Sequence, residues 1–243
     1  DLGNWNVSSV TTGMTNIFHN ANSLSNANKG LIHTAFSSSP HWTYDWSAHV
    51  LAPASLTNAN FQAAVNLWCT DKAAAFATYG HIKEWNVTGV TDMGSAFRHR
   101  TTFDENITRW DVSNVTNMHQ MFNGASSFNQ DIGDWNVSSV LNLGRAFWNA
   151  TSFDQDLGNW NTASVTQFES MFRDARSFNQ DIGLWNTSMA TNFGTMFRDA
   201  NSFNQDIGDW NTSSVENFDG MFKGANAFDQ DLSDWDVSAA TAN

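Results

Sequence analysis

The segment FNQDIGDWNVSSV, from Phe128 to Val140, decides the fold because close copies of it return along the chain at a constant spacing. The tryptophan of each copy lies 25 residues after the previous one, without an insertion or a deletion. So strict a period is typical of proteins in which one small unit is stacked many times. The tryptophans of this column are Trp85, Trp110, Trp135, Trp160, Trp185, Trp210 and Trp235.

Two columns of phenylalanine share the same period. A unit of this size is too small to bury its own aromatic side chains, so they leave water only when units stack on one another. We therefore expect all three aromatic columns to be buried, although an exposed tryptophan column would suit the stacking of sugar rings. The phenylalanines are Phe97, Phe122, Phe147, Phe172, Phe197 and Phe222 in one column, and Phe103, Phe128, Phe153, Phe178, Phe203 and Phe228 in the other.

Within one unit, the apolar spacing predicts both a helix and extended chain. Met118, Met121, Phe122 and Ala125 have the i, i+3, i+4, i+7 spacing of a short helix. The segment from Phe128 to Val140 suits short, kinked extended pieces with a bend at a glycine. The pattern predicts an α/β repeat solenoid over residues 81–243, with about seven coils of one short helix and short parallel strands.

The unit MFNGASSFNQDIGDWNVSSV, residues 121–140, resembles the BspA-type leucine-rich repeat family, also called DUF285. The resemblance extends over residues 83–243 and, in part, over residues 1–18. It implies a leucine-rich-repeat-like solenoid on a secreted or cell-surface protein, with adhesion or protein binding as the general role. It implies no catalytic residue, because the family motif consists of structural positions. In this chain Phe, Trp and Met replace much of the leucine.

Residues 23–80 interrupt the repeat after a partial first unit in residues 1–22. Two stretches in this insert have helical apolar spacing, and Thr57 is a candidate cap for the second of them. We interpret the insert as a helical pair that either covers the first full coil or carries a binding site, and a catalytic role is a third reading. The stripes are Ala27, Leu31, Ala35 and Phe36 in the first stretch, and Phe61, Ala64, Val65 and Trp68 in the second.

The loop between these stretches is rich in aromatic residues and histidine. Trp42, Tyr44 and Trp46, with His41 and His49 beside them, either pack into the core or form a recognition loop. As a recognition loop they are the candidate residues for a glycan.

Aspartate recurs in a column of its own, and two carboxylates about 5 Å apart repel by about 0.8 kcal/mol even in water. Hydrogen bonds from backbone amides, or from neighbouring residues such as Asn129 and Gln130, would offset this repulsion. The alternative is a calcium site, because carboxylate oxygens suit a hard cation. The column consists of Asp131, Asp156, Asp181, Asp206 and Asp231.

Basic residues form a second polar column at the end of the expected helix: Arg98, Arg173, Arg198 and Lys223. Such a column is either a solvated surface or a stripe that binds a partner. The chain as a whole has a formal net charge of -13. This charge disfavours nucleic acid and anionic lipid as partners.

The remaining features limit the class of protein. Cys69, the single cysteine, excludes a disulfide framework, and no apolar run approaches the roughly 20 residues that cross a bilayer. The opening DLGNWN matches the middle of the later phrase that starts at Asp156, so we expect a piece of a longer protein. The sequence carries no GxSxG, HExxH or phosphate-loop motif.

These observations predict a non-enzymatic, extracellular or cell-surface module that binds a protein or another surface ligand through one face. A structural subunit or spacer that assembles with itself in a surface fibre, and a glycan-binding module, are the alternatives. No cofactor is expected apart from the calcium alternative.

Overall fold

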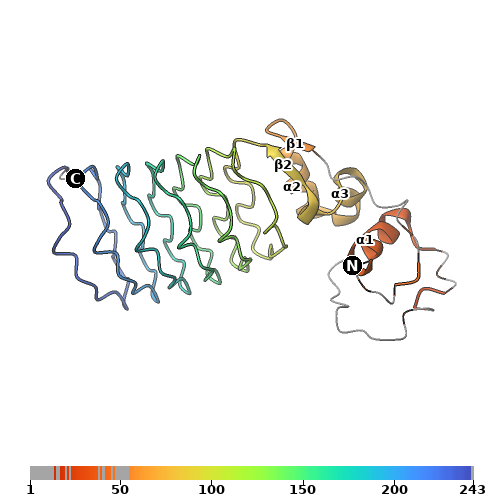
Figure 1. The fold of residues 1–243 in the computed structure, drawn as a ribbon. Helices are drawn as coiled ribbons and strands as arrows, with labels where there is room; N and C mark the ends of the chain where they lie inside the picture. Colours follow the sequence, from red (N-terminus) through yellow and green to blue (C-terminus); the bar gives the residue numbers. More distant parts are fainter. Residues whose placement is uncertain are drawn as a thin grey trace.

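The repeat units lie side by side as successive coils in the computed structural model, with the helices gathered at the N-terminal end (Figure 1). The structure describes residues 14, 17–19, 21, 23–37, 39, 42–44, 46 and 55–241. Most of the predicted partial first repeat, including Trp5, lies outside the described residues, as do His41 and His49.

The first helix, α1 (Asn26–Phe36), begins after Ser25, whose hydroxyl oxygen accepts a hydrogen bond from the Asn28 amide at 3.1 Å. The helix lies against α3. Its buried residues Ile32 and Phe36 pack with Met14 in a small cluster separate from the core of the coils. In the described part of the chain, no helix is both long and apolar enough to cross a bilayer.

The chain enters the coils through β1 (Ser55–Thr57), α2 (Phe61–Thr70), α3 (Lys72–Tyr79), the short 3-10 helix η2 (Ile82–Glu84) and β2 (Asn86–Gly89). The strands β1 and β2 pair in parallel, so the residues before α2 lie beside the start of the first coil. The predicted cap Thr57 belongs to β1 instead, and its amide donates to Asn60 Oδ1 at 2.8 Å. Asn60 takes the N-cap position of α2, and its side chain makes no capping hydrogen bond there.

The apolar side of α2 continues the core of the coils. Phe61 and Trp68 are buried, and their rings lie 5.8 Å from Trp110 and 5.8 Å from Trp85. The third helix, α3, was not predicted as a separate element. It starts because the Asp71 carboxylate accepts the Ala74 amide at 3.0 Å, which caps a new helix immediately after α2.

Successive coils are joined by parallel backbone bridges between residues 25 apart. Each bridge is a single residue pair, so the strands expected in every coil are reduced to isolated contacts. The bridged pairs are Asp92 with Asn117, Asn117 with Asn142, Asn142 with Gln167, Gln167 with Asn192, and Asn192 with Asn217.

The short helix expected in each unit is absent from the described coils, and consecutive turns replace it. In the coil that begins at Met118, every second amide donates to the next coil, as in Gln120 to Gly144 O at 3.0 Å and Phe122 to Ala146 O at 2.8 Å. The amides between them close turns three residues back, as in Met121 to Met118 O at 3.1 Å. Although they are not helical, these turns bury the same side chains that the helical spacing singled out, Met118, Met121, Phe122 and Ala125.

The aromatic columns form the core. Phe122 stacks on Phe128 of its own coil at 3.9 Å between ring centroids and on Phe147 of the next coil at 5.5 Å. The predicted burial of the tryptophan column is confirmed from Trp85 to Trp210, where each ring is 3–4% exposed, whereas Trp235 is partly exposed. Most of these indoles donate to the preceding coil, as Trp160 does to the Ile132 carbonyl at 3.0 Å. A glycan cannot stack on rings that are buried in this way.

A buried histidine lies where the helices meet the first coil. His81 is 8% exposed, packs against Trp68 with the ring centroids 5.2 Å apart, and accepts the Lys83 amide at its Nδ1. Burial, reinforced by the charges of Lys83 and Lys72, lowers the pKa of His81 from 6.5 to about 4. The folded protein therefore keeps this imidazole neutral at a pH where the unfolded chain would protonate it.

We expect the free energy of unfolding to fall as the pH drops from 6.5 to about 4. The unfolded chain binds the His81 proton in this range and the folded protein does not, so this site removes at most about 1.4 kcal/mol per pH unit. The stabilisation is complete above pH 6.5 and lost below about 4. Urea titrations at a series of pH values measure the slope, and His81→Gln should flatten it. Equal slopes for the two proteins would contradict the prediction.

Candidate functional site

The predicted aspartate column is exposed, and each carboxylate accepts the backbone amide two residues later. Examples are Gly133 to Asp131 at 3.1 Å and Gly158 to Asp156 at 2.8 Å. In the last coil the amide of Ser233, followed by its hydroxyl, lowers the pKa of the Asp231 carboxyl. Backbone amides thus bond the carboxylates of the column, and such bonds favour the charged form of a carboxylate.

The residues next to the aspartate column, Asn129 and Gln130, bond to a different aspartate in the preceding coil. Gln130 and the amide of Asn129 both donate to Asp104 Oδ1, each at 2.9 Å. The same hydrogen bond recurs in later coils, where a side-chain oxygen of one coil accepts a backbone amide of the next. In one of them Asn204 Oδ1 accepts the Asp229 amide at 2.8 Å.

Among the described residues, no group of three or more His, Cys, Asp or Glu side chains is arranged so as to hold a metal ion. The calcium alternative for the aspartate column stays a prediction.

The charges of the coils are segregated. The residues that correspond to 104–111 in each coil contain fourteen acidic side chains and one basic side chain, Arg109, and we call this surface the acidic edge. Like charges gathered in this way give one side of the array a strongly negative potential. Its acidic residues are Asp104, Glu105, Asp111, Asp131, Asp134, Asp154, Asp156, Asp181, Asp206, Asp209, Asp229, Asp231, Asp234 and Asp236.

Most of the basic residues lie on a different part of each coil, the turns that replace the expected helix. Seven of the eleven lysines and arginines fall in the segments that correspond to residues 94–101, together with four acidic residues. We use the name cationic face for six residues of this surface. They are the four predicted basic residues Arg98, Arg173, Arg198 and Lys223, together with Arg145 and Trp148.

Trp148 is the centre of the cationic face. The guanidinium carbons of Arg173 and Arg145 lie 4.7 and 5.7 Å from the centroid of its ring, within the range of cation–π attraction. The indole nitrogen donates to the Asp174 carboxylate at 3.4 Å. The ring is partly exposed, unlike the indoles from Trp85 to Trp210 in the buried column.

Ion pairs to neighbouring carboxylates orient the arginines of this face. Arg145 bonds to Glu169 at 2.6 Å, and Arg198 lies 3.3 Å from the Asp199 carboxylate. Because these pairs are partly exposed, each contributes no more than about 1 kcal/mol of stability. Their effect is to limit the positions that the guanidinium groups can take.

The backbone beneath the face is unusual. Among the residues that the structure describes, nine other than glycine have positive φ angles of 54 to 61°, and all nine lie in two columns of the turns. Arg145 and Asn149 are two of these residues, and both donate their amides to the next coil, at 2.7 and 2.8 Å. The hydrogen bonds between coils therefore hold the turns in a conformation that side chains disfavour.

A cavity of about 300 Å³ opens beside Trp148, and its lining includes Arg98, His99, Asn123 and Asp174. Close by, burial and then the charge of Arg145 lower the pKa of His119. The face thus combines a partly exposed aromatic ring, oriented cations and a shallow recess.

The aromatic residues of the insert pack on one another. Trp42 and Trp46 lie against the cluster that contains Phe36, and Tyr44 accepts the Phe18 amide at its hydroxyl oxygen at 3.0 Å. The rings of Trp42 and Tyr44 are 5.2 Å apart and tilted by 47°. They form a compact cluster, whereas a polymer of sugars needs a row of open faces.

The sequence pattern did not single out Trp148 or Arg145. The sequence does distinguish Trp148, because the other coils have Arg, Asn or Lys at this position. Trp148 also lies outside the column of tryptophans that repeat every 25 residues.

One comparison with known proteins gives a match. A family model described as "Mycoplasma protein of unknown function, DUF285" matches residues 1–38, 69–180 and 154–243. Neither the curated proteins nor the solved structures that were compared include a match to the chain.

Proposed function

Because the chain belongs to the DUF285 family, whose function is unknown, we propose a function from the surface of the molecule. The coils form a leucine-rich-repeat-like solenoid of the BspA type that binds an acidic protein partner through the cationic face. It does so without catalysis, outside the cell or at the cell surface. The observation that carries this proposal is the partly exposed Trp148 ring, which has the guanidinium carbons of Arg173 and Arg145 within 4.7 and 5.7 Å of its centroid.

Residue types support the choice of this face. Tryptophan and arginine are enriched at protein interfaces and among the residues that contribute most of the binding energy. Here two guanidinium groups lie over a partly exposed tryptophan ring, and ion pairs restrict both, Arg145 with Glu169 and Arg173 with Asp174. Restricted side chains lose less conformational entropy when a partner binds.

Charge indicates the kind of partner. The cationic face stands on a chain whose net charge is -13, so an acidic molecule is attracted to this face and repelled by the acidic edge. A partner with carboxylates beside an apolar or aromatic residue would match both the guanidinium groups and the indole ring.

A second copy of the chain is the competing partner, because its acidic edge complements the cationic face. This contact would give the structural assembly that the sequence offered as an alternative. Sedimentation velocity distinguishes the two: binding to a foreign partner leaves the free chain monomeric, whereas self-assembly makes its sedimentation depend on concentration.

The test uses a phage-displayed library of random peptides, selected on the immobilised chain and counted before and after selection. We expect the selected peptides to be rich in Asp and Glu with an aromatic or aliphatic residue. Trp148→Ala should lower the affinity for the best peptide at least about tenfold, a loss of about 1.4 kcal/mol in binding free energy. Added salt should weaken binding as well.

Leu184→Ala serves as the control, since Leu184 is 90% exposed and lies on the acidic edge. This variant should bind the peptide as the unchanged chain does. Peptides without an acidic excess, or equal affinity of the Trp148→Ala variant, would overturn the proposal.

A further inference from the structure

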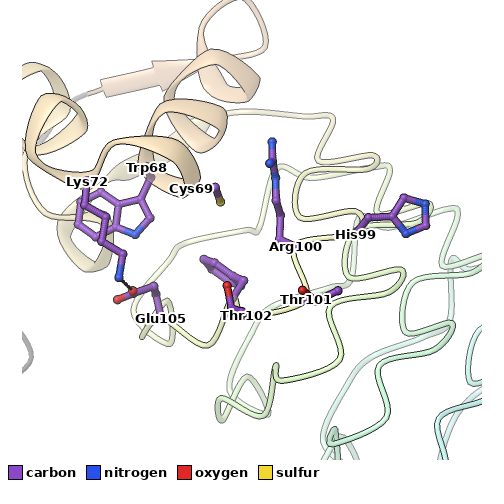
Figure 2. A pocket seen from close by; sticks show the side chains of 9 residues that line it. Trp68, Cys69, Lys72, His99, Arg100, Thr101, Thr102 and Glu105 are labelled. Atoms are coloured by element: carbon purple, nitrogen blue, oxygen red, sulfur yellow. Dashed lines mark hydrogen bonds and ion pairs between the residues drawn. The ribbon is translucent and has the colours of Figure 1, made fainter.

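A pocket of about 250 Å³ lies where α2 and the start of α3 meet the turns of the first coil (Figure 2). Trp68, Cys69 and Lys72 approach it from the helices, and residues 99–103 with Glu105 approach it from the coil. We call it the junction pocket. Its two walls come from segments about 30 residues apart, so it exists only because the helices pack on the coil.

The indole nitrogen of Trp68 has no partner. Trp68 is 2% exposed, and its Nε1 is buried without a hydrogen bond to the protein. The neighbouring indoles donate to carbonyl oxygens, Trp85 to Gly80 at 3.2 Å and Trp110 to Ile82 at 2.8 Å. Figure 2 shows that Nε1 of Trp68 points into the junction pocket, toward the space between Glu105 and Thr102.

A buried donor without an acceptor is unfavourable, and a ligand oxygen at this position would supply the missing acceptor. Among the described residues, the Trp135 indole also lacks a partner, but Trp135 lies within the stacked column and lines neither of the two cavities described above. The unpaired donor of Trp68 is therefore the one that a molecule in the pocket could use.

The other polar groups of the pocket are mostly donors. Lys72 pairs with Glu105, and Arg100 uses one nitrogen to bond Asn66 Oδ1 at 2.8 Å, which leaves further guanidinium donors. Thr101 and Thr102 add hydroxyl groups to the lining. With two cations against one carboxylate, this part of the pocket favours an anion.

The remaining surface is apolar. The rings of Trp68 and Phe103 line the pocket, and the Cys69 thiol stays uncharged because burial raises its pKa. A ligand that fits must join an anionic oxygen group to a small apolar body, and the volume holds about a dozen non-hydrogen atoms.

We propose that the junction pocket binds a small organic carboxylate, with the carboxylate accepting from Trp68 Nε1 and Arg100 and the apolar body lying against Phe103. This site is independent of the cationic face, since it is built from the helices and the first coil. It assigns a ligand to the part of the chain that interrupts the repeat, whose sequence suggested only a cap or a binding head.

The experiment follows the indole amide signals of the complete chain by NMR while benzoate is added as the probe. We expect the Trp68 signal to shift and to saturate with benzoate, whereas the neutral amide benzamide leaves it unchanged. Trp68→Phe keeps an aromatic ring and removes the donor, and it should lower the affinity for benzoate at least about tenfold. Arg100→Gln should lower this affinity by a similar factor, and it leaves the Trp68 signal available as the reporter.

Trp148→Phe is the matched control, because it removes an indole donor from the cationic face and should leave benzoate binding unchanged. This control also separates the two proposals, because it should change peptide binding at the cationic face and leave benzoate binding in the junction pocket as it was. A Trp68 signal that does not move, or one that moves equally with benzamide, overturns the inference. Unchanged benzoate affinity in the Arg100→Gln variant overturns it as well, even if Trp68→Phe fails to fold.

Discussion

Replacing Phe172 with alanine is expected to lower the free energy of unfolding by about 3–5 kcal/mol. Phe172 is completely buried and lies in the middle of the coils. Its ring stacks on Phe178 at 3.9 Å, on Phe147 at 5.6 Å and on Phe197 at 5.7 Å. The substitution removes the ring from three stacked contacts and leaves a cavity that well-packed neighbours cannot close.

Phe222→Ala is the matched control for this substitution. Phe222 belongs to the same column but is partly exposed, and it stacks on Phe228 at 4.1 Å and on Phe197 at 5.8 Å. Its loss should be smaller by at least about 1 kcal/mol, because less ring surface is buried. Urea titrations of the three proteins give the comparison. Equal losses at the two positions would contradict the prediction that fuller burial and a second neighbouring coil make Phe172 the more stabilising residue.

Deleting residues 143–167 is expected to leave a folded protein, whereas deleting residues 143–154 should abolish cooperative unfolding. The first deletion removes one whole period of 25 residues, so Phe168 takes the place of Leu143 and every column stays in register. The second joins Asn142 to Gln155, which places polar residues where the next coil needs buried aromatic rings.

Circular dichroism and urea titration measure this contrast. The shorter chain with whole units should unfold in one transition at a somewhat lower urea concentration, since it has fewer interfaces between coils. Similar behaviour of the two deletions would show that the period does not determine the packing of the coils. The deletion that breaks the register removes the smaller number of residues, so a greater loss of structure in that variant cannot come from its length.

The burial of the aromatic columns could be predicted because it depends on spacing alone. Trp160 and Phe172 repeat at a fixed interval and have no other way to leave water. The backbone that carries them could not be predicted in the same way. Met118, Met121 and Phe122 have helical spacing, but the structure has turns in place of a helix. Alternate amides of these turns donate to the next coil, and the turns bury the same side chains.

The candidate sites depended still more on tertiary structure. The basic column was visible in the sequence, but the closeness of both guanidinium groups to the Trp148 ring follows from the stacking of the coils that contain Arg145 and Arg173. The junction pocket had no sequence signal, because Trp68 and Arg100 belong to segments without a shared pattern.

By itself the amino-acid sequence determined the period, the columns and the identity of the residues that must be buried, because each follows from spacing along one chain and from the cost of exposing apolar surface. The tertiary structure alone decided which amide bonds to which carbonyl, why turns replace a helix, and where donors such as Trp68 Nε1 are left without a partner. The physical reason is that a hydrogen bond depends on the distance and direction between groups that the chain brings together from remote positions, and no pattern within a single unit specifies them.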